Sequence, residues 1–461
     1  MKIIQLFIVF MIGVLSVNAQ QLQGTWHAQL NLAMPLKLVL HIEKDGKKWS
    51  TKMDSPDQNA FGIALENTTV KGQTITIQDS RMQMQINTQL QGDSLVGQFK
   101  QGGLELPIVL YNNEARLPKK KINRPQTPKA PFDYNIDTLN IKDANGLNIH
   151  GVFTYPKGKT NFPVVVLISG SGTQDMDVTI FEHKLFWVIA DYLTQNGIGV
   201  FRFDDKGAGK SEGNPMLTTT DVIVEDVYFI TNALQQKYSN QINAMHILGH
   251  SQGGTVAMKY AAQQPKNLNS IILMAAPGIL GKDLILQQYQ TIGKMNGLSE
   301  EDINKIMFRN GQFYDAVITG KDSIGIASAL EVSVGKIYPT LSETEKSGMS
   351  QDAYFQTINQ QMNNAIIKDL VAYTPADDLS KIKCKVLAIN GDLDIQVLST
   401  PNLAAITKGL AGSEKEINIK SYPYLNHLFQ YAITGAIEEY ETIDETIEVE
   451  VLEDLASYLN N

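Results

Sequence analysis

A serine enclosed by glycines constrains this chain more than any other feature of the sequence. Residues 249–254 read Gly-His-Ser-Gln-Gly-Gly, after the apolar run 244–248 and before the helix-forming segment 255–262. A strand that stops in a tight turn and restarts as a helix holds the turn residue in a strained conformation. Only neighbours without side chains leave room for that turn. The pattern therefore predicts a nucleophile elbow that exposes the hydroxyl of Ser251.

Residues 1–19 have the features of a secretory signal peptide. Lys2 gives a basic start, residues 3–14 are apolar, and residues 17–19 (Val-Asn-Ala) form a small-residue cleavage pattern. A membrane anchor is the weaker alternative, because the apolar run is shorter than the ~20 residues that a membrane span needs. We therefore expect an exported protein, periplasmic or secreted, with no membrane span once the signal is removed.

Composition argues against several classes of function. The formal net charge is -9 and becomes -10 once Lys2 leaves with the signal, so nucleic acid is not an expected partner. Cys384 is the only cysteine, and the seven scattered histidines include no His-Glu-x-x-His pattern, so no zinc site is indicated. Residues 207–211 end like a phosphate-binding loop, but Asp204 stands where that motif requires glycine. We expect neither a metal nor a cofactor.

Hydrophobic periodicity separates an amino-terminal domain and a linker from the rest of the chain. From residue 20 to residue 111 apolar and polar residues alternate between turn signals, which predicts a small antiparallel all-β domain, either a meander, a sandwich or a barrel. Residues 112–132 are rich in proline and lysine and predict a solvated linker. The clearest strand patterns are 36–42, 74–77, 82–86 and 95–99, and the clearest turns are Asp45-Gly46, Lys71-Gly72, Gly92-Asp93 and Gly102-Gly103.

From residue 133 to residue 461 strands alternate with helices, which predicts a mainly parallel, doubly wound α/β sheet covered on both faces. The expected strands are 136–141, 147–155, 163–168, 199–203, 244–248, 270–274 and 385–389, and the expected helices are 181–195, 220–238 and 255–262. About one hundred residues, 278–373, interrupt this alternation with helical patterns at 284–295, 299–309, 314–318 and 351–369. An insertion of that length predicts a helical cap over the carboxyl ends of the strands, where ligands bind in open α/β sheets.

A nucleophilic serine needs a base, and the base needs an orienting carboxylate. On an α/β sheet with a serine elbow the chain order is serine, acid, histidine, and His427 is the only histidine after His250. The acid is expected in the loop after the strand that ends at Asn390, where Asp392 and Asp394 are the candidates. Asp392 directly follows a glycine, and aspartate at such a place usually satisfies turn amides, so Asp394 is preferred.

Acyl transfer also needs hydrogen-bond donors aimed at the developing oxyanion. The backbone N–H of Gln252 is one candidate, because it lies at the amino end of the helix after the elbow. The second candidate is the backbone N–H of Ser171, in the turn Ser-Gly-Ser-Gly at residues 169–172, whose glycines let the backbone approach a substrate closely. The alternative is that residues 169–172 form only a tight turn.

In their order along the chain, these segments resemble the α/β-hydrolase superfamily, particularly secreted or periplasmic carboxylesterases and the serine aminopeptidase-like hydrolases. The matching segments are 168–175, 202–211, 249–254, 390–397 and 426–430, spread from about residue 133 to the end. The resemblance implies Ser251 as nucleophile, His427 as base and Asp394 as acid, since the family's Gly-x-x-Asp-x-x-Val loop falls on residues 391–397. It also implies that the 202–211 turn is structural. Ser-Gly at 169–170 departs from the His-Gly of many members, which bears on the assignment of Ser171.

The expected reaction is hydrolysis of a carboxylic ester through a covalent acyl-enzyme, with a small-molecule ester as substrate. A serine aminopeptidase that acts on short peptides is the first alternative, and relative rates on nitrophenyl esters and aminoacyl nitroanilides separate the two. A carbohydrate- or peptide-binding protein with a vestigial triad is the second alternative, and it predicts that a fluorophosphonate leaves Ser251 unlabelled. The sequence pattern sets no acyl group, alcohol or oligomeric state.

Overall fold

The computed structural model describes residues 22–30, 36–56, 60–101, 104–117, 123–341, 346 and 348–461. The chain forms two compact units, residues 1–121 and residues 122–461, and each is described by itself. The predicted signal peptide, the turn at Gly102-Gly103 and residues 118–122 of the predicted linker lie outside the described residues. Within these ranges no helix has the length and apolar character that crossing a membrane requires.

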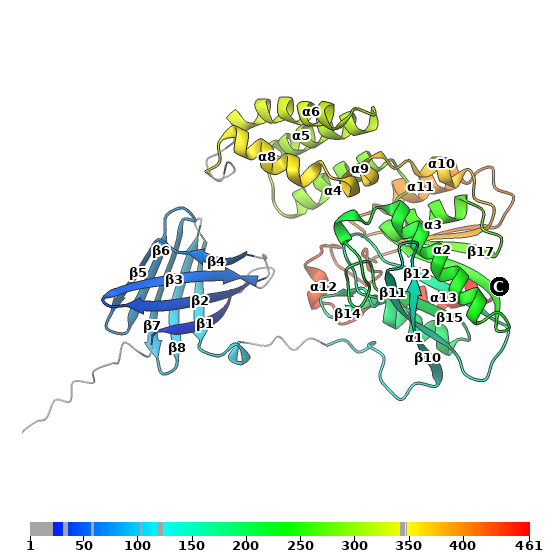
Figure 1. Cartoon of the computed structure of the whole chain (residues 1–461), viewed down its shortest axis with the longest axis horizontal. Coiled ribbons are helices and arrows are strands. Elements are labelled where there is room, and N and C mark those ends of the chain that lie inside the picture. The colour runs from blue at the N-terminus through cyan, green and yellow to red at the C-terminus, as the bar shows by residue number, and fades with distance from the viewer. Residues whose placement is uncertain are drawn as a thin grey trace, which may run out of the picture. The chain divides into compact units, whose positions relative to one another are not determined.

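The amino-terminal unit is an antiparallel β barrel (Figure 1). Its strands pair in the order β2-β1-β9-β8-β7-β6-β5-β3-β4, and an additional pairing of β2 with β3 closes the sheet. Alternate residues point inward, as in β1, where Trp26, Ala28 and Leu30 are buried. Of the three folds left open by the sequence, the barrel is therefore the one observed. The strands are β1 (Gly24–Leu30), β2 (Leu36–Asp45), β3 (Lys48–Ser55), β4 (Ala60–Ala64), β5 (Asn67–Lys71), β6 (Thr74–Asp79), β7 (Met84–Gln91), β8 (Ser94–Gln101) and β9 (Leu104–Tyr111).

The predicted glycine turns of the barrel have the expected backbone. Gly46, Gly72 and Gly92 have φ values of 58°, 61° and 65°, a left-handed conformation that favours glycine. The strand predicted at 82–86 begins two residues later, because Gln83 also has a positive φ, 48°. Residue 82 therefore belongs to the turn before β7.

The carboxy-terminal unit is built on an eight-stranded sheet in the order β10-β11-β15-β12-β16-β17-β18-β19. An antiparallel hairpin of β10 and β11 opens it, as predicted, and the pairs from β15–β12 onward are parallel. The predicted α/β fold is confirmed. The strands are β10 (Tyr134–Lys142), β11 (Asn148–Pro156), β12 (Phe162–Ile168), β15 (Gly199–Phe203), β16 (Ile242–His250), β17 (Leu268–Met274), β18 (Lys385–Gly391) and β19 (Ile417–Tyr422).

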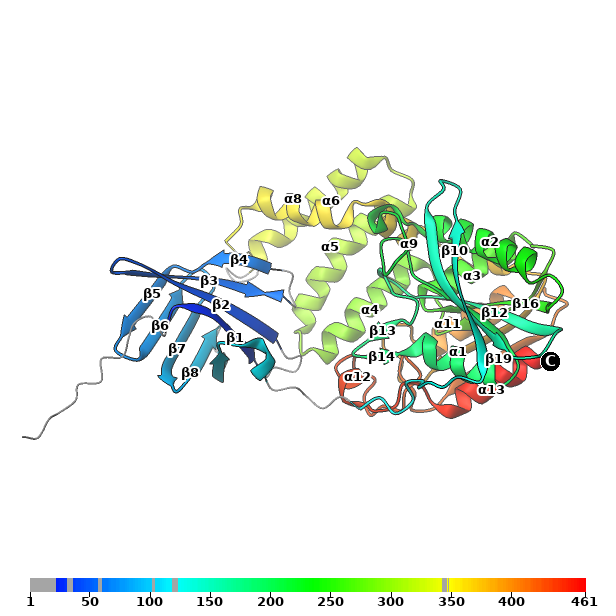
Figure 2. The same ribbon diagram turned by 60° about the horizontal axis from the view of Figure 1, so that its bottom comes forward.

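Helices cover both faces of this sheet (Figure 2). The buried strand β12 shows why: Val164 and Val166 pack into the core under α2, α3 and α11, whereas Val165 and Leu167 pack into the core under α1 and α13. The covering helices are α1 (Leu185–Gln195), α2 (Thr220–Lys237), α3 (Gln252–Ala262), α10 (Pro375–Leu379), α11 (Ser399–Gly409), α12 (Glu439–Thr442) and α13 (Val449–Asn460).

Helix α1 starts four residues later than predicted. Phe181 and Glu182 have φ values of 48° and 64°, and they form the turn between the short strands β13 (Thr179–Ile180) and β14 (His183–Lys184). The apolar residues at 180–181 resemble a helix start in sequence, but this hairpin occupies them.

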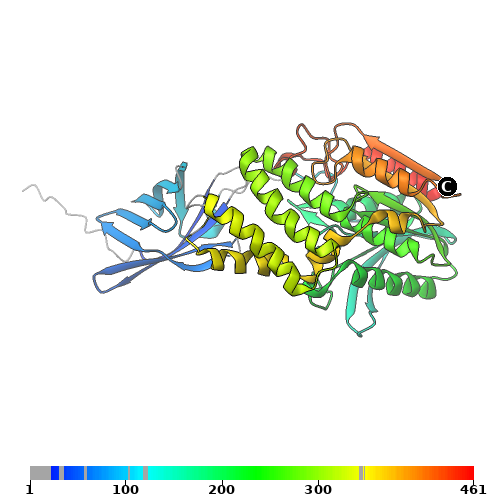
Figure 3. The ribbon, with the colours of Figure 1, turned by 90° about the horizontal axis from the view of Figure 1, so that it is seen from above.

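The insertion between β17 and β18 is a helical cap with its own apolar core, which includes Phe313, Leu330, Val334 and Val371 (Figure 3, yellow-green to yellow helices). The two helices predicted at 299–309 and 314–318 are one helix, because burial of its far end outweighs the weak helix propensity of Gly311. The cap helices are α4 (Gly281–Met295), α5 (Glu300–Ile318), α6 (Ser323–Ile337), α8 (Gln351–Met362) and α9 (Ala365–Ala372).

Two further details of the cap differ from the prediction. Helix α6 was absent from it, and the single helix predicted at 351–369 is the pair α8 and α9. The helix breaks because Asn364 is the N-cap residue of α9. Its side-chain oxygen accepts a hydrogen bond from the Ile367 N–H at 3.0 Å, and a new helix begins there.

The end of the predicted linker is docked on the carboxy-terminal unit. The Arg124 guanidinium donates to the carbonyl oxygens of Phe181 at 2.7 Å and Ile443 at 2.9 Å. The Gln126 side chain donates to the carbonyl of Ile447 at 2.7 Å and accepts from its N–H at 3.0 Å. The prediction of a solvated spacer therefore does not hold for these residues, because their side chains satisfy backbone groups of loops distant in sequence.

Candidate active site

Ser251 occupies the turn between β16 and α3, with φ 54° and ψ -122°. This strained conformation is stabilised by a hydrogen bond from the Ser251 N–H to the Met274 carbonyl at 2.9 Å. The surrounding glycines are required by space. A Cβ on Gly249 would lie 2.0 Å from the Gly253 carbonyl oxygen, and a Cβ on Gly253 would lie 2.3 Å from the Ile168 carbonyl oxygen. The segment has the nucleophile-elbow geometry that the sequence predicts.

His427 and Asp394 meet in the loops that follow β19 and β18. The His427 Nδ1–H donates to the Asp394 Oδ2 at 2.7 Å, and the side chains are 5% and 0% exposed. The other carboxylate oxygen of Asp394 accepts from the backbone N–H groups of Gln396 and Val397, both at 2.8 Å. The carboxylate is thus fixed on both oxygens, and it holds the imidazole with Nε2 free to accept a proton.

Asp392 has a different environment. Its carboxylate accepts a hydrogen bond from the Ser421 hydroxyl on β19, and its backbone N–H donates to the Tyr422 carbonyl at 2.9 Å. The structure therefore brings Asp394, and not Asp392, to His427. The turn N–H groups, which were expected to bind Asp392, donate to Asp394 instead. These hydrogen bonds also hold the Asp394 carboxylate in place.

His250, next to Ser251, supports the loop that carries His427. Its Nε2–H donates to the His427 carbonyl at 2.9 Å, and the two rings lie 4.8 Å apart. Burial lowers the pKa of His250 to about 3, so the ring is neutral at physiological pH and can keep this donor. The elbow and the base are therefore linked through one residue. The prediction did not include this role, because the two residues are 177 positions apart.

Asn426 fixes the same loop from within. Its side-chain oxygen accepts from the N–H groups of Leu428 and Gln430, both at 3.0 Å, and the residue is fully buried. His427 thus lies on a loop held by Asn426 from one side and by His250 from the other. In the described chain no hydrogen bond joins the Ser251 hydroxyl to the His427 Nε2, and such bonds often form only with a bound substrate.

Ser171 and Gln252 line the same cavity as Ser251. Neither backbone N–H donates to another group in the described ranges. The 169–172 turn lies directly against the elbow: a Cβ on Gly170 would lie 3.1 Å from the Ser251 Cβ. The structure therefore places the two residues predicted to supply the oxyanion donors at one cavity.

The cavity at Ser251 lies beneath the cap and has a volume of about 70 Å³. Cap residues supply most of its apolar wall, and the residues after β16 supply its polar floor. No carboxylate is among the described side chains that line it. The lining residues are Ser171, Ser251, Gln252, Thr255, Pro277, Gly281, Leu284, Ile285, Gln288, Leu370, Tyr373 and Val397.

The 202–211 turn is held together by buried charges. The Asp204 carboxylate accepts from the N–H groups of Met176 and Lys210, both at 2.9 Å, and so fills the position that an anion would take in a phosphate loop. Lys206 is buried between Asp226 at 2.5 Å and Asp143 at 2.9 Å. These contacts stabilise the backbone and agree with the structural role that the resemblance implies.

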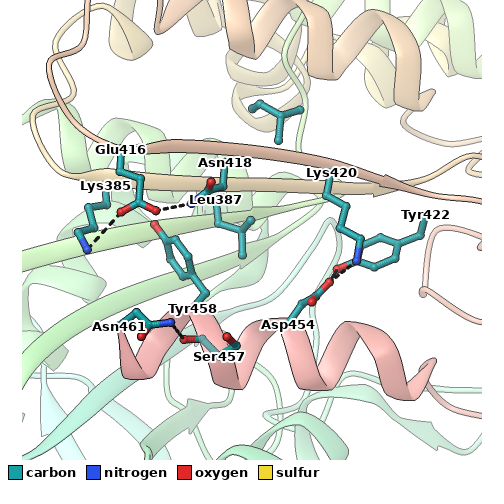
Figure 4. A pocket seen from close by; sticks show the side chains of 11 residues that line it. Lys385, Leu387, Glu416, Asn418, Lys420, Tyr422, Asp454, Ser457, Tyr458 and Asn461 are labelled. Atoms are coloured by element: carbon teal, nitrogen blue, oxygen red, sulfur yellow. Dashed lines mark hydrogen bonds and ion pairs between the residues drawn. The ribbon is translucent and has the colours of Figure 1, made fainter.

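A larger hollow of about 400 Å³ lies at the edge strand β19, beside α13 (Figure 4). Its charged side chains pair with one another: Lys420 with Asp454 at 2.5 Å, and Lys385 with Glu416 at 3.4 Å. None of the predicted catalytic residues lines it. It therefore has no part in the chemistry of the elbow.

A second contact between a histidine and a carboxylate lies on the barrel. The His41 Nε2 is 2.7 Å from the Asp54 Oδ2, and the other oxygen of Asp54 accepts from the Gly62 N–H at 2.6 Å. Asp54 thus ties neighbouring strands together, which gives this pair a structural role. Within the described ranges, no three or more His, Cys, Asp or Glu side chains lie together in a group that could hold a metal ion.

The sheet order, the serine elbow and the helical cap are those of the α/β-hydrolase fold. Residues 182–307, which include the elbow, match the family model described as "Serine aminopeptidase, S33". The chain thus has the α/β-hydrolase fold, and its similarity to the serine aminopeptidase model is confined to those residues.

Curated relatives include both esterases and a peptidase. Esterase EstD of Thermotoga maritima is 28% identical over 167 residues, which are 36% of this chain and 40% of that protein. Proline iminopeptidase of Chitinophaga pinensis is 29% identical over 119 residues, which are 25% of this chain and 36% of that protein. The chain thus matches less than half the length of either relative. An esterase structure from Pyrococcus furiosus has 12% identity and a TM-score of 0.42, with 74% of this chain and 97% of that chain covered.

Proposed function

We propose that this protein is a serine hydrolase that cleaves carboxylic esters through a covalent acyl-enzyme. The observation that carries the proposal is the hydrogen bond of 2.7 Å between His427 and the buried Asp394, on the loops beside the strained Ser251. A serine, a histidine that can accept a proton at Nε2 and a fixed carboxylate are the groups that acyl transfer requires.

In the proposed reaction the Ser251 Oγ attacks the ester carbonyl carbon while His427 takes the hydroxyl proton at Nε2. The resulting oxyanion accepts hydrogen bonds from the N–H groups of Ser171 and Gln252. The carbon–oxygen bond to the alcohol then breaks, and His427 returns its proton to the leaving alkoxide. Water, deprotonated by His427, attacks the acyl-enzyme, and the carboxylic acid leaves as Ser251 recovers its proton. Asp394 stabilises the imidazolium at each stage.

The cavity favours an ester over a peptide with a free amino terminus. An aminopeptidase must hold a protonated α-amine, and a carboxylate is the side chain that binds it in a desolvated site. The described lining of this cavity contains no carboxylate. The match to a serine aminopeptidase model keeps the peptidase as the second candidate.

The size of the cavity supports a short acyl group. A volume of about 70 Å³ has room for roughly five to seven water-sized groups. Leu284, Ile285 and Leu370 provide an apolar wall for an alkyl chain. We therefore propose small, uncharged acyl esters as the substrate class.

The test is an assay of the wild type beside Ser251→Ala on nitrophenyl esters of increasing acyl length and on aminoacyl nitroanilides. We expect wild-type turnover of short esters, little turnover of anilides, and loss of both in the variant. A labelled fluorophosphonate should modify the wild type and leave Ser251→Ala unmodified. Equal ester activity in both proteins would end the proposal, and faster turnover of anilides would replace the esterase with a peptidase.

The proposal also covers compartment and cofactors. Export follows from residues 1–19, and the protein recovered from a secreting host should begin at Gln20. The proposed chemistry uses side chains and backbone donors alone, so chelators should leave the rate unchanged. Export and hydrolysis are tested separately, and the failure of either leaves the other standing.

A further inference from the structure

Asp205 lies directly beneath the turn that carries Ser171. It follows β15 and is partly buried. Burial raises the pKa of its carboxyl to about 6, so the group is ionised at neutral pH and accepts hydrogen bonds on both oxygens. The family resemblance assigned the 202–211 turn a structural role only, and the contacts of Asp205 point toward the elbow.

Asp205 binds both ends of the 169–174 loop. The Ser169 hydroxyl donates to its carboxylate at 2.8 Å, and the Gln174 N–H donates to it at 2.8 Å. The Asp205 N–H in turn donates to the Gln174 carbonyl at 3.1 Å. The Gln174 side chain extends this network inward, since its amide donates to the Ser171 carbonyl at 3.1 Å. Ser171 is thus the middle of a loop closed by one carboxylate.

This loop cannot be held by apolar packing. A Cβ on Gly170 would be crowded, at 3.1 Å from the Ser251 Cβ, and Gly172 has a φ of +90°. Glycine on both sides of Ser171 leaves the backbone intrinsically free to rotate. An oxyanion donor must nevertheless stay within a few tenths of an ångström of its productive position. The hydrogen bonds of Asp205 at the two ends of the loop allow glycines beside Ser171 and still hold the Ser171 N–H in position.

We propose that Asp205 is a positioning residue that aims the Ser171 N–H at the oxyanion. The inference rests on the proposed function, because it concerns the second donor of that same site. Asp205 touches no reacting atom and acts through the loop. The neighbouring Asp204 accepts hydrogen bonds from the N–H groups of Met176 and Lys210 instead. Asp204 and Asp205 therefore bind different backbone groups.

The test uses Asp205→Asn in the full chain. The asparagine side chain is neutral and has one acceptor oxygen in place of two, so the charge-assisted hydrogen bonds to the loop are weakened while the volume is kept. We expect kcat to fall about tenfold to a hundredfold, less than the ~10²–10³ for loss of a whole oxyanion donor, with KM changed less than threefold. The affinity for an alkyl trifluoromethyl ketone should fall by the same factor as kcat/KM, because its adduct with Ser251 carries the oxyanion.

Asp226→Asn is the matched control. Burial also raises the pKa of Asp226 to about 6, and its carboxylate pairs with Lys206 at 2.5 Å. It makes no hydrogen bond to residues 169–174, all of which are described. We expect wild-type kcat and wild-type ketone affinity in this variant, after its folding has been checked by circular dichroism.

Ser169→Ala is the second test, and it keeps the inference open to refutation should Asp205→Asn fail to fold. It removes one of the two loop contacts from the opposite side, and kcat and ketone affinity should fall together by several-fold. Wild-type kinetics in either variant would overturn the positioning role. A fall in kcat without a parallel loss of ketone affinity would do the same. If the positioning role of Asp205 were wrong, Ser251→Ala would still be inactive and the proposed function would stand. If Ser251→Ala were active, the proposed function itself would be wrong.

Discussion

Replacing Asp394 with asparagine should inactivate the protein without unfolding it. The Oδ1 of Asp394 accepts from two backbone N–H groups, of Gln396 and Val397, at 2.8 Å each. A backbone N–H can only donate a hydrogen bond, so the position of Oδ1 must be taken by the carbonyl oxygen of the asparagine and not by its NH2 group. Its NH2 group then faces the Nδ1 of His427, where the carboxylate accepted at 2.7 Å.

A donor at that position reverses the tautomer of His427. Nδ1 becomes the acceptor and the ring proton moves to Nε2, which can then no longer take the proton of Ser251. In a catalytic triad this tautomer costs about 10⁴ in kcat, or about 5.5 kcal/mol of transition-state stabilisation. We therefore expect kcat for a short nitrophenyl ester at neutral pH to fall about ten-thousandfold.

The matched control is Asp392→Asn, two residues away. The Asp392 carboxylate bonds the Ser421 hydroxyl and does not contact His427. We expect kcat within threefold of the wild type for this control, and cooperative thermal unfolding for both variants. If Asp394→Asn retained more than about a tenth of wild-type activity, or if both variants lost the same activity, the assignment of the acid would be wrong.

Three further outcomes follow from the structure. Gly253→Ala should be inactive and less stable by about 1–3 kcal/mol in urea denaturation, because its Cβ would lie 2.3 Å from a backbone oxygen. The control Gly311→Ala has open space around the new Cβ and should be slightly more stable than the wild type. Leu284→Ala should raise kcat/KM for longer acyl esters relative to kcat/KM for acetate esters, by about fourfold for each methylene newly buried. If this ratio of kcat/KM values did not change, Leu284 would not limit acyl length. Burial lowers the pKa of His246 to about 4 from 6.5, so its contribution to stability is complete above pH 6.5 and is lost as the pH falls toward 4. Urea titrations should show a slope about 1.4 kcal/mol per pH unit shallower in His246→Leu than in the wild type.

The parts of the site that lie close together in sequence could be predicted. The elbow depends on a strand, three glycines and a helix within one segment, and those features dictate the backbone of Ser251. Chain order led to His427 and to the loop of Asp394, and the structure brings these two residues together. Their catalytic roles remain predictions until the variants are assayed.

The supporting residues could not be predicted, because their partners are distant in sequence. His250 contacts a carbonyl 177 positions away, and Asp205 contacts a serine 36 positions away. A polar residue after a strand is compatible with many partners, and only the sheet order decides which loops meet. The same reason explains the cap, where burial of Phe313 and its neighbours joins two expected helices into one.

The docking of Arg124 and Gln126 changes where the hydrolase unit begins. Composition alone places the start near residue 133, after the last linker proline. A shortened chain that started there would leave the carbonyls of Phe181, Ile443 and Ile447 without the donors that bind them. One of these carbonyls belongs to the hairpin before α1, and the other two belong to the segment between α12 and α13. For expression and crystallisation of the hydrolase alone, the first residue should therefore be chosen before Asn123.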